Sequence, residues 1–353
     1  MTPSHQQIQQ GHPHWQIPDS WHQIQTIDMH TGGEPLRVIL EGFPPPDGRN
    51  VLAYRRYLRD EHDHLRKALM HEPRGHADMY GCVLLPPNDP GGDFGIVFLH
   101  NEGYSTMCGH AIIAIVKLAV ERKWVEVKEP ETVLHIDAPC GRIKAFASVA
   151  NGRVGKVRFH CVPSFVLHQQ ARLNVPDLGE VVFDIAYGGA FYAYVDAPSL
   201  ELELSTQNYS QIMSAGRRIK QAIIDSSLPI VHPLEPEMSF LYGTIFIGPP
   251  LQHPVDSRNV CVFADGEVDR CPTGSGVSGR MALHHAKGEI GLGEEMTIES
   301  ITGSLFMGSV VELSSCGDHQ AVIPQVSGTA YVTGQHTFLI DPDDPFKEGF
   351  FLR

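Results

Sequence analysis

Two stretches of sequence decide the fold: MCGHAIIAIV at residues 107–116 and PTGSGVSGRMAL at residues 272–283. Each places a small polar or nucleophilic side chain beside glycine, and a run with helical periodicity follows. The pattern predicts one buried helix in each half of the chain, beginning at the motif. The repeat indicates a weak internal duplication in which only the first copy carries a thiol at the helix start.

Outside these stretches, strand-like runs outnumber helical ones. We expect further helices over residues 50–70, where Asn50 is a suitable N-cap, and over residues 209–225. Short apolar runs between glycine turns predict strands in both halves, including a hairpin at Asn151 and Gly152. The length of 353 residues suggests two domains.

Composition argues against several classes of protein. A formal net charge of −14 disfavours a nucleic-acid partner, and no apolar stretch is long enough to span a membrane. Residues 1–15 lack the apolar core of a secretory signal. Seven scattered cysteines without a CxxC pair indicate a reducing compartment, here the cytoplasm. The histidines lack the spacing of zincin-type sites, so we expect no metal.

Cys108 is the candidate catalytic base. A thiol at a helix N-terminus has a lowered pKa, because the helix dipole and the unsatisfied amides favour the thiolate. Gly109 would let a ligand approach the backbone closely. The alternative is a buried structural thiol, which is how most cysteines occur in proteins.

The second stretch offers an anion site instead of a base. Gly274 and Ser275 lack the glycine fingerprint of a dinucleotide site and the lysine of a P-loop, so we interpret them as a backbone cradle for a carboxylate. An ordinary capped glycine turn is the alternative. Asp269 and His110 together could hold a ring nitrogen or an ammonium group, with a plain surface ion pair as the alternative for the aspartate.

Five ordered segments resemble the signature blocks of the proline racemase family. They are IDMHTGGEPLRV (27–38), RGHADMYG (74–81), NEGYSTMCGH (101–110), DIAYGGAFYA (184–193) and DRCPTGSG (269–276). The resemblance covers about residues 24–345 and implies an α/β (α+β) fold of two similar domains. Each domain is then a curved mixed β-sheet around a central helix, as in diaminopimelate epimerase, with the active site in the cleft between the domains.

The expected division of the chain follows from this resemblance. Residues 1–20 form a flexible N-terminal arm. Residues 21–138 form the first domain, which residues 326–353 complete, and residues 139–325 form the second domain.

The resemblance also implies roles for the residues at the two motifs. The family's racemases use two cysteines, one on each face of the substrate α-carbon. Cys108 matches the first cysteine, whereas Thr273 occupies the second position, and this departure marks a subgroup that dehydrates trans-3-hydroxy-L-proline.

The substrate-binding residues implied by the family lie beside these two positions. His110 and Asp269 would lie near the substrate nitrogen. The helix starts Gly109-His110 and Gly274-Ser275 would bind the carboxylate. No cofactor is needed in this family.

The expected reaction is the dehydration of trans-3-hydroxy-L-proline to Δ1-pyrroline-2-carboxylate. Cys108 removes the α-proton, and the hydroxyl of Thr273 is too weak an acid to return one at neutral pH, so the β-hydroxyl leaves. The closest alternative is a proline racemase or 4-hydroxyproline 2-epimerase, which would need Cys271 as its second base; we interpret Cys271 as structural.

Two other classes stay open, a cysteine-dependent hydrolase and a non-catalytic imino-acid-binding protein. The expected partner is a small imino acid, with neither nucleic acid nor membrane. A homodimer is the assembly considered.

Overall fold

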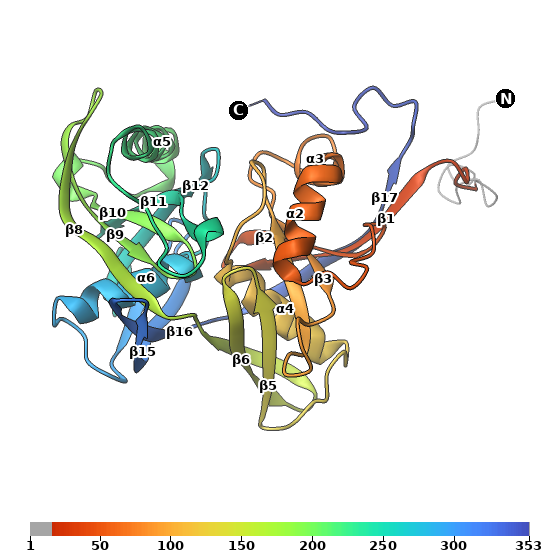
Figure 1. Ribbon diagram of the computed structural model, residues 1–353, viewed down its shortest axis with the longest axis horizontal. Helices are drawn as coiled ribbons and strands as arrows, with labels where there is room; N and C mark the ends of the chain where they lie inside the picture. The colour runs from red at the N-terminus through yellow and green to blue at the C-terminus, as the bar shows by residue number, and fades with distance from the viewer. Residues whose placement is uncertain (1–15, 353) are drawn as a thin grey trace.

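The computed structural model describes residues 16–352, which form two lobes side by side (Figure 1). The first lobe is residues 22–160 together with 330–340, and the second lobe is residues 164–328. Of the expected N-terminal arm, residues 1–15 lie outside the described residues, and residues 16–20 belong to no helix or strand. No described helix is both long and apolar enough to cross a membrane.

The first lobe is a curved mixed sheet around one central helix. Its strands are β1 (His22–Thr31), β2 (Glu34–Glu41), β3 (Gly81–Leu85), β4 (Phe94–Leu99), β5 (Glu131–Ala138), β6 (Gly141–Ala150), β7 (Arg153–His160) and β17 (Ala330–Ile340). Its helices are α2 (Val51–Glu61), α3 (Asp63–Met70) and the central α4 (Gly109–Glu121).

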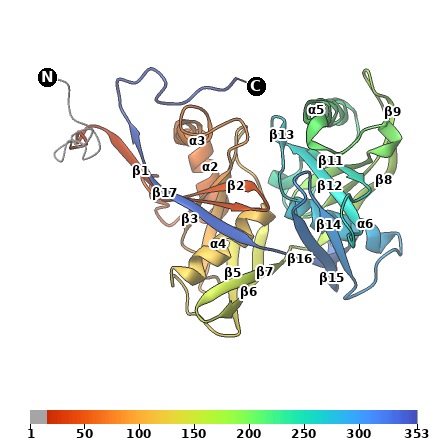
Figure 2. The ribbon, with the colours of Figure 1, turned by 180° about the vertical axis from the view of Figure 1, so that it is seen from behind.

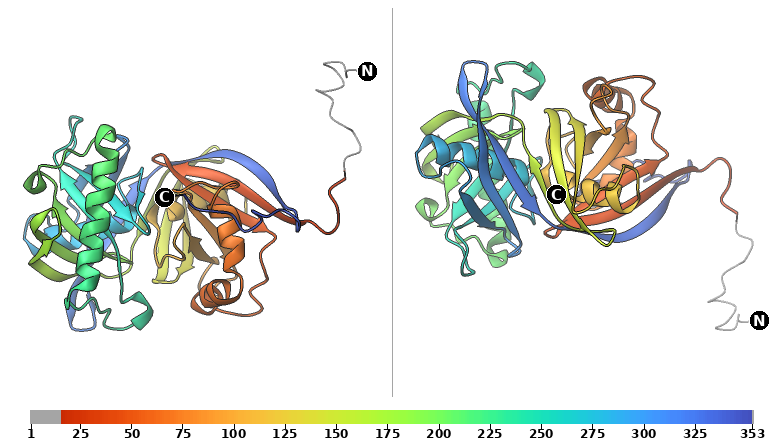
Figure 3. Two further views of the ribbon diagram at one scale, coloured as in Figure 1. Left: turned by 90° about the horizontal axis from the view of Figure 1, so that it is seen from above. Right: turned by 90° about the horizontal axis from the view of Figure 1, so that it is seen from below.

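The second lobe has the same plan. Its strands are β8 (Ser164–Val175), β9 (Gly179–Tyr187), β10 (Phe191–Asp196), β11 (Leu241–Gly248), β12 (Ser257–Phe263), β13 (Glu267–Val268), β14 (Glu295–Glu299), β15 (Leu305–Cys316) and β16 (His319–Gly328). Its helices are α5 (Tyr209–Asp225), the central α6 (Gly274–Ala286) and three short 3₁₀ segments, η1 (Pro198–Leu200), η2 (Thr206–Asn208) and η3 (Pro236–Met238). Seen from above, α5 covers the outside of this lobe (Figure 3).

The pairing of the strands shows the internal duplication. In the first lobe β2 runs parallel to β3, β3 antiparallel to β4, and β4 parallel to β5. In the second lobe β10 runs parallel to β11, β11 antiparallel to β12, and β12 parallel to β14. Helix α4 lies between β4 and β5 in the chain, and α6 lies between β12 and β14. The two helix starts are therefore equivalent positions in the repeat.

The central helices are buried for different reasons. Helix α4 is apolar, and within it only Lys117 and Glu121 are not fully buried. Helix α6 contains small residues that let the surrounding strands approach. A Cβ atom on Gly276 would lie 2.3 Å from Ile245 Cδ1, and one on Gly279 would lie 2.3 Å from the hydroxyl of Tyr194.

One long segment joins the lobes. Strand β16 pairs with β7 of the first lobe and with β8 and β15 of the second, and β17 continues from it to pair with β1 (Figure 2). Strand β6 pairs with β5, β7 pairs with β6, and both strands pack against α4, so we group them with the first lobe; the domain boundary at residue 138 stays a prediction. The local pattern predicts the hairpin at Asn151 and Gly152, but the partners of the hairpin lie far away in the sequence.

The helix expected over residues 50–70 is interrupted. It consists of α2 and α3, which meet at His62. Asn50 caps α2 as expected, because its side chain accepts a hydrogen bond of 2.9 Å from the amide of Ala53. The helix expected over residues 209–225 is confirmed as α5.

Candidate active site

The first turns of α4 and α6 meet at the junction of the lobes. A Cβ atom on Gly109 would lie 2.6 Å from Gly274 Cα, and one on Gly274 would lie 2.7 Å from Gly109 Cα. The two backbones approach this closely only because neither residue has a side chain. This contact explains why a glycine follows the helix cap in both copies of the motif.

A narrow cavity of only about 10 Å³ lies beside this contact, and residues of both lobes line it. The lining includes all seven residues predicted from the sequence: Cys108, Gly109, His110, Asp269, Thr273, Gly274 and Ser275. The other lining residues are aromatic or apolar: Tyr80, Met107, Tyr192, Tyr242 and Phe263.

Cys108 and His110 form a buried pair at the start of α4. The sulfur of Cys108 lies 3.1 Å from Nδ1 of His110, and Nε2 of His110 lies 3.2 Å from the carbonyl oxygen of Pro35. A carbonyl only accepts hydrogen bonds, so Nε2 carries the ring hydrogen and Nδ1 faces the thiol as an acceptor. Burial lowers the pKa of His110, which keeps the imidazole neutral and able to accept a proton.

The expected lowering of the Cys108 pKa is wrong for this structure. Burial raises the pKa of the thiol well above its ordinary value. The Ala111 amide at the helix start and the Tyr80 hydroxyl act in the opposite direction, and the charge of Asp269 raises the pKa further. Desolvation therefore outweighs the helix terminus, and the thiol needs a base before it can act as one.

Thr273 occupies the equivalent position at the start of α6, but it is tied to Asp269. Its hydroxyl donates to Oδ2 of Asp269 at 2.7 Å, and Oδ1 accepts from the amide of Cys271 at 2.8 Å. The backbone of Thr273 has a φ of 67°, in the left-handed region that is strained for a β-branched residue. The only hydroxyl proton of Thr273 is thus directed to a carboxylate.

Asp269 gives the cavity a negative side. Burial raises the pKa of the Cys271 thiol, and the charge of Asp269 raises it further. No lysine or arginine is among the residues that line the cavity. An ammonium group beside Asp269 would balance this buried charge.

The two helix starts give the cavity a positive side. The first helical hydrogen bonds run from Ile112 to Cys108 at 3.1 Å and from Val277 to Thr273 at 2.7 Å. The amides that precede Ile112 and Val277 in each first turn have no acceptor within the helix, so they can bind an anion. The side chain of Ser275, in the first turn of α6, is held by a hydrogen bond of 2.7 Å to the hydroxyl of Tyr192.

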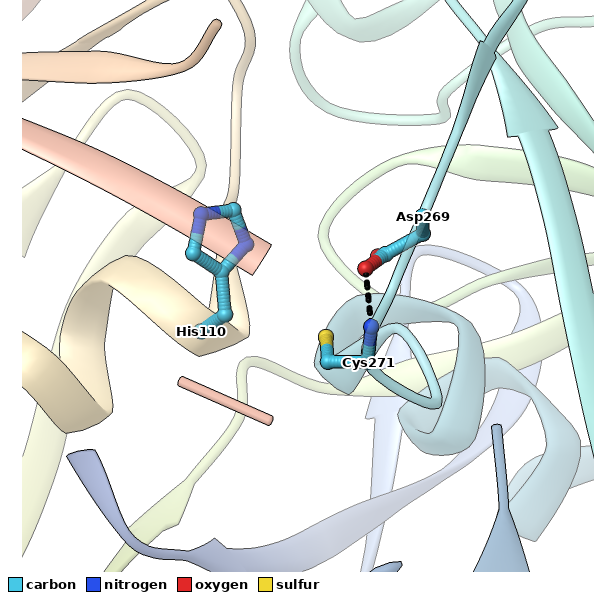
Figure 4. Close-up of side chains that lie close together, drawn as sticks. All are labelled: His110, Asp269 and Cys271. Carbon is cyan, nitrogen blue, oxygen red and sulfur yellow. Dashed lines mark hydrogen bonds between the residues drawn. The ribbon is translucent and has the colours of Figure 1, made fainter. Parts of the chain in front are cut away.

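His110, Asp269 and Cys271 lie close together across the lobe junction (Figure 4). Their ligand atoms lie within 4.8 Å of one another, and zinc binds to such groups. Each of these ligand atoms already faces a partner within the protein. The partners of His110 and Asp269 are described above, and the sulfur of Cys271 accepts a hydrogen bond of 3.4 Å from the amide of Thr273. We therefore interpret the carboxylate and the imidazole as a place for an ammonium group; the absence of a functional metal stays a prediction.

Cys271 lies close to His110 and Asp269 but outside the lining of the cavity. Its side chain is fully buried and is not among the residues that line the cavity. Cys271 packs against Gly32 of the first lobe. A Cβ atom placed on Gly32 would lie 3.1 Å from the Cβ atom of Cys271. These contacts support the structural interpretation of Cys271.

Sequence reasoning misses the tyrosines of the cavity wall. Tyr80 and Tyr192 lie inside two of the family-like segments, residues 74–81 and 184–193, so a signal for them was present in the sequence. Tyr242 lies in β11, outside every such segment, and only the folded arrangement brings it to the cavity.

Polar contacts hold the two lobes together over the cavity. Oε2 of Glu34 in the first lobe accepts a hydrogen bond of 2.7 Å from the amide of Arg270 in the second. The guanidinium of Arg270 pairs with Asp78 at 2.5 Å, and Arg55 pairs with Glu237 at 3.2 Å. Because the cavity measures only about 10 Å³, the lobes must move apart before an imino acid can enter it.

Comparisons with known proteins agree with this arrangement. A family model described as proline racemase matches residues 26–351. A trans-3-hydroxy-L-proline dehydratase of Colwellia psychrerythraea is 51% identical over 335 residues, which cover 95% of this chain and 94% of that protein. A trans-3-hydroxy-L-proline dehydratase of Homo sapiens is 45% identical over 336 residues, which cover 94% and 95%.

A solved structure confirms the expected two-domain, epimerase-like α+β fold. The crystal structure of a hydroxyproline epimerase from Agrobacterium vitis, with bound trans-4-hydroxy-L-proline, matches with a TM-score of 0.87 at 31% identity. The match covers 94% of this chain and 96% of that one. The chain belongs to the proline racemase family.

Proposed function

We propose that the protein dehydrates trans-3-hydroxy-L-proline to Δ1-pyrroline-2-carboxylate. The observation that carries the proposal is the single thiol in a two-sided site, with Cys108 at one helix start and Thr273 at the other. The relatives from Colwellia psychrerythraea and Homo sapiens, which are named for this activity, support it.

The groups that line the cavity suit a small zwitterionic imino acid, which the site could admit once the lobes move apart. The amides at Gly109-His110 and Gly274-Ser275 would bind the carboxylate, because two helix N-termini converge there. Asp269 would bind the protonated ring nitrogen, with His110 beside it. Closure of the lobes excludes water and strengthens both interactions.

The reaction would begin with a proton transfer inside the pair at the start of α4. The thiol of Cys108 gives its proton to Nδ1 of His110, 3.1 Å away, which leaves a thiolate beside an imidazolium. The Asp269 carboxylate, with its ligand atom within 4.8 Å of that of His110, would stabilise the imidazolium.

Elimination would then follow on one face of the ring. The thiolate takes the α-proton, the electrons of that bond form the double bond between C2 and C3, and the C3–O bond breaks. The 3-hydroxyl is trans to the carboxylate, so it lies on the same face as the α-hydrogen. The Cys108 thiol formed in the first step can therefore protonate the leaving group, which departs as water, and the enamine product tautomerises to the cyclic imine.

Thr273 would prevent the competing reaction. Racemisation requires an acid on the opposite face that can return a proton to the α-carbon. The Thr273 hydroxyl is too weak an acid and already donates to Asp269 at 2.7 Å. No cofactor takes part in this scheme. We also propose that the protein is a homodimer and lies in the cytoplasm, although the chemistry requires neither.

Proton NMR of the purified protein with three compounds tests the proposal: trans-3-hydroxy-L-proline, trans-4-hydroxy-L-proline and L-proline. We expect only the 3-hydroxy compound to be converted, with signals of the cyclic imine as product. Conversion of trans-4-hydroxy-L-proline to its C2 epimer would instead identify an epimerase. If all three compounds stay unchanged, the hydrolase and the non-catalytic binding protein become the better interpretations.

A further inference from the structure

The hydroxyl of Tyr242 makes no hydrogen bond of good geometry to any described residue. Tyr242 lies in β11 of the second lobe, is only 5% exposed and lines the catalytic cavity. Buried polar groups in folded proteins are nearly always hydrogen-bonded, and leaving one unsatisfied is destabilising. A hydroxyl kept in this state at the wall of a cavity points to a ligand group that satisfies it.

The surroundings fix the position of this hydroxyl. The ring of Tyr242 packs against Phe263 with 5.4 Å between centroids and against Tyr192 with 5.7 Å. Burial raises the pKa of the phenol well above its ordinary value, so the phenol keeps its proton and is available as a donor.

The hydroxyl belongs to the Cys108 side of the cavity. After burial, the charge of Glu267 raises the pKa of the phenol further. The nearby hydroxyls of Tyr80 and Ser105 lower this pKa as hydrogen-bonding neighbours, and the thiol of Cys108 raises it. Tyr80 in turn acts on that thiol, and its ring packs edge-on against His110 at 4.9 Å. Tyr242 therefore reaches across the lobe junction toward the face from which the α-proton is removed.

We propose that the Tyr242 hydroxyl binds the 3-hydroxyl group of the substrate and so selects imino acids that carry this group on the Cys108 face. The inference rests on the proposed function, because trans-3-hydroxy-L-proline places its α-hydrogen and its hydroxyl on the same face. The phenol donates a hydrogen bond to the oxygen of the C3–O bond and keeps its proton throughout. The proton that leaves with the hydroxyl as water still comes from Cys108.

The test compares two ligands that differ only in the 3-hydroxyl, on the wild type and on Tyr242→Phe. The kcat/KM for trans-3-hydroxy-L-proline should fall about tenfold in the variant, as expected for one lost hydrogen bond. The inhibition constant of L-proline, which lacks the hydroxyl, should stay within about twofold because L-proline never makes this bond. The melting temperature of the ligand-free variant should rise, since the substitution removes an unsatisfied buried hydroxyl.

Tyr104→Phe is the matched control. The Tyr104 hydroxyl is also buried without a hydrogen bond of good geometry to a described residue, but Tyr104 is not in the lining of the catalytic cavity. This variant should also be stabilised, with both the kcat/KM and the inhibition constant unchanged. It separates the loss of a buried hydroxyl from the loss of a contact with the substrate.

Three outcomes would overturn the inference. In the first, Tyr242→Phe weakens L-proline as much as it lowers kcat/KM, which would mean that Tyr242 only shapes the cavity. In the second, neither value changes. In the third, the ligand-free variant is destabilised, which would show that the hydroxyl has a hydrogen-bond partner within the protein. Failure of the wild type to convert trans-3-hydroxy-L-proline would refute the proposed function instead, and the wild-type arm shows this before any variant is compared.

Discussion

At the start of α4, Cys108 has an extended backbone with a φ of −146°, and its sulfur faces the ring of His110. At the start of α6, Thr273 has a φ of 67°, and its hydroxyl donates to Asp269. The two positions are equivalent in the repeat of strands and helices, and their glycines touch. The two starts share a first helical turn whose amides are free within the helix. They differ in the backbone conformation of Cys108 and Thr273 and in the hydrogen-bond partners of these two side chains.

This difference shows how a duplicated fold can change its reaction while its arrangement of strands and helices stays the same. The shared amides can hold a carboxylate from both sides, because that task needs only helix N-termini. Proton transfer needs a group that ionises, and only the first start has one. The choice between elimination and racemisation would therefore depend on a single side chain.

Replacing the thiol should have the largest effect. In Cys108→Ser, turnover of trans-3-hydroxy-L-proline should fall at least about a thousandfold, because a serine hydroxyl does not ionise beside a neutral histidine. Thermal melting should show little change in stability. Cys271→Ser is the control and should keep most of its turnover, since Cys271 does not line the cavity. A Cys108→Ser enzyme that retained most of its turnover would refute the thiolate role.

Separating the two helix starts should have the next largest effect. A Cβ atom in Gly109→Ala or Gly274→Ala would lie 2.6 or 2.7 Å from the facing backbone, so the two first turns must move apart. Misplacement of this kind should lower kcat/KM by about a hundredfold and reduce the melting temperature. Gly103→Ala, where a Cβ atom meets nothing within 4 Å, is the control and should behave like wild type. Equal behaviour of all three variants would show that the contact does not position the site.

The pH profile tests the partner of the thiol. Burial lowers the pKa of His110 below its ordinary value of 6.5, so the imidazole is neutral above that pH and can accept the thiol proton. The kcat/KM should accordingly be level at and above pH 6.5 and should fall by about tenfold per pH unit only once the pH drops below the lowered pKa of His110, as one essential group becomes protonated. The variant His110→Gln should be much slower and should lose this acid limb. A limb at or above neutral pH would contradict a neutral, buried acceptor.

Making the two starts alike should have the smallest effect and the most informative one. Thr273→Cys puts a thiol on the opposite face, so some racemisation of L-proline or epimerisation of trans-4-hydroxy-L-proline should appear. The new activity should be weak, because Asp269 loses the hydrogen bond from the Thr273 hydroxyl. Chiral analysis of the recovered imino acid measures it. A folded variant with no exchange of the α-proton on the opposite face would count against a two-sided site.

The residues that could be predicted from the sequence are those whose roles are local. Cys108 and Thr273 stand at helix starts because glycines and a helical run follow them, and Asn50 caps α2 through its own side chain. The family-like segments also locate Asp269 and His110 in one site, which the shared cavity supports.

What could not be predicted depends on contacts between distant parts of the chain. Strand β7 pairs with β16, more than 150 residues away, and this pairing joins the first lobe to the second. The pKa of Cys108 depends on how deeply the folded lobes bury it, which a helix-start motif does not state. Tyr242 reaches the cavity from β11 without any motif around it.

The most direct test of the central claim follows the α-proton of the wild-type enzyme in D2O. L-Proline and trans-4-hydroxy-L-proline have no leaving group on C3, so they report whether a second base exists on the Thr273 face. The account predicts that trans-3-hydroxy-L-proline is dehydrated while the other two compounds keep their configuration at C2. Deuterium at C2 of either compound together with inversion would contradict it, because a proton would then have been returned on the face that Thr273 occupies.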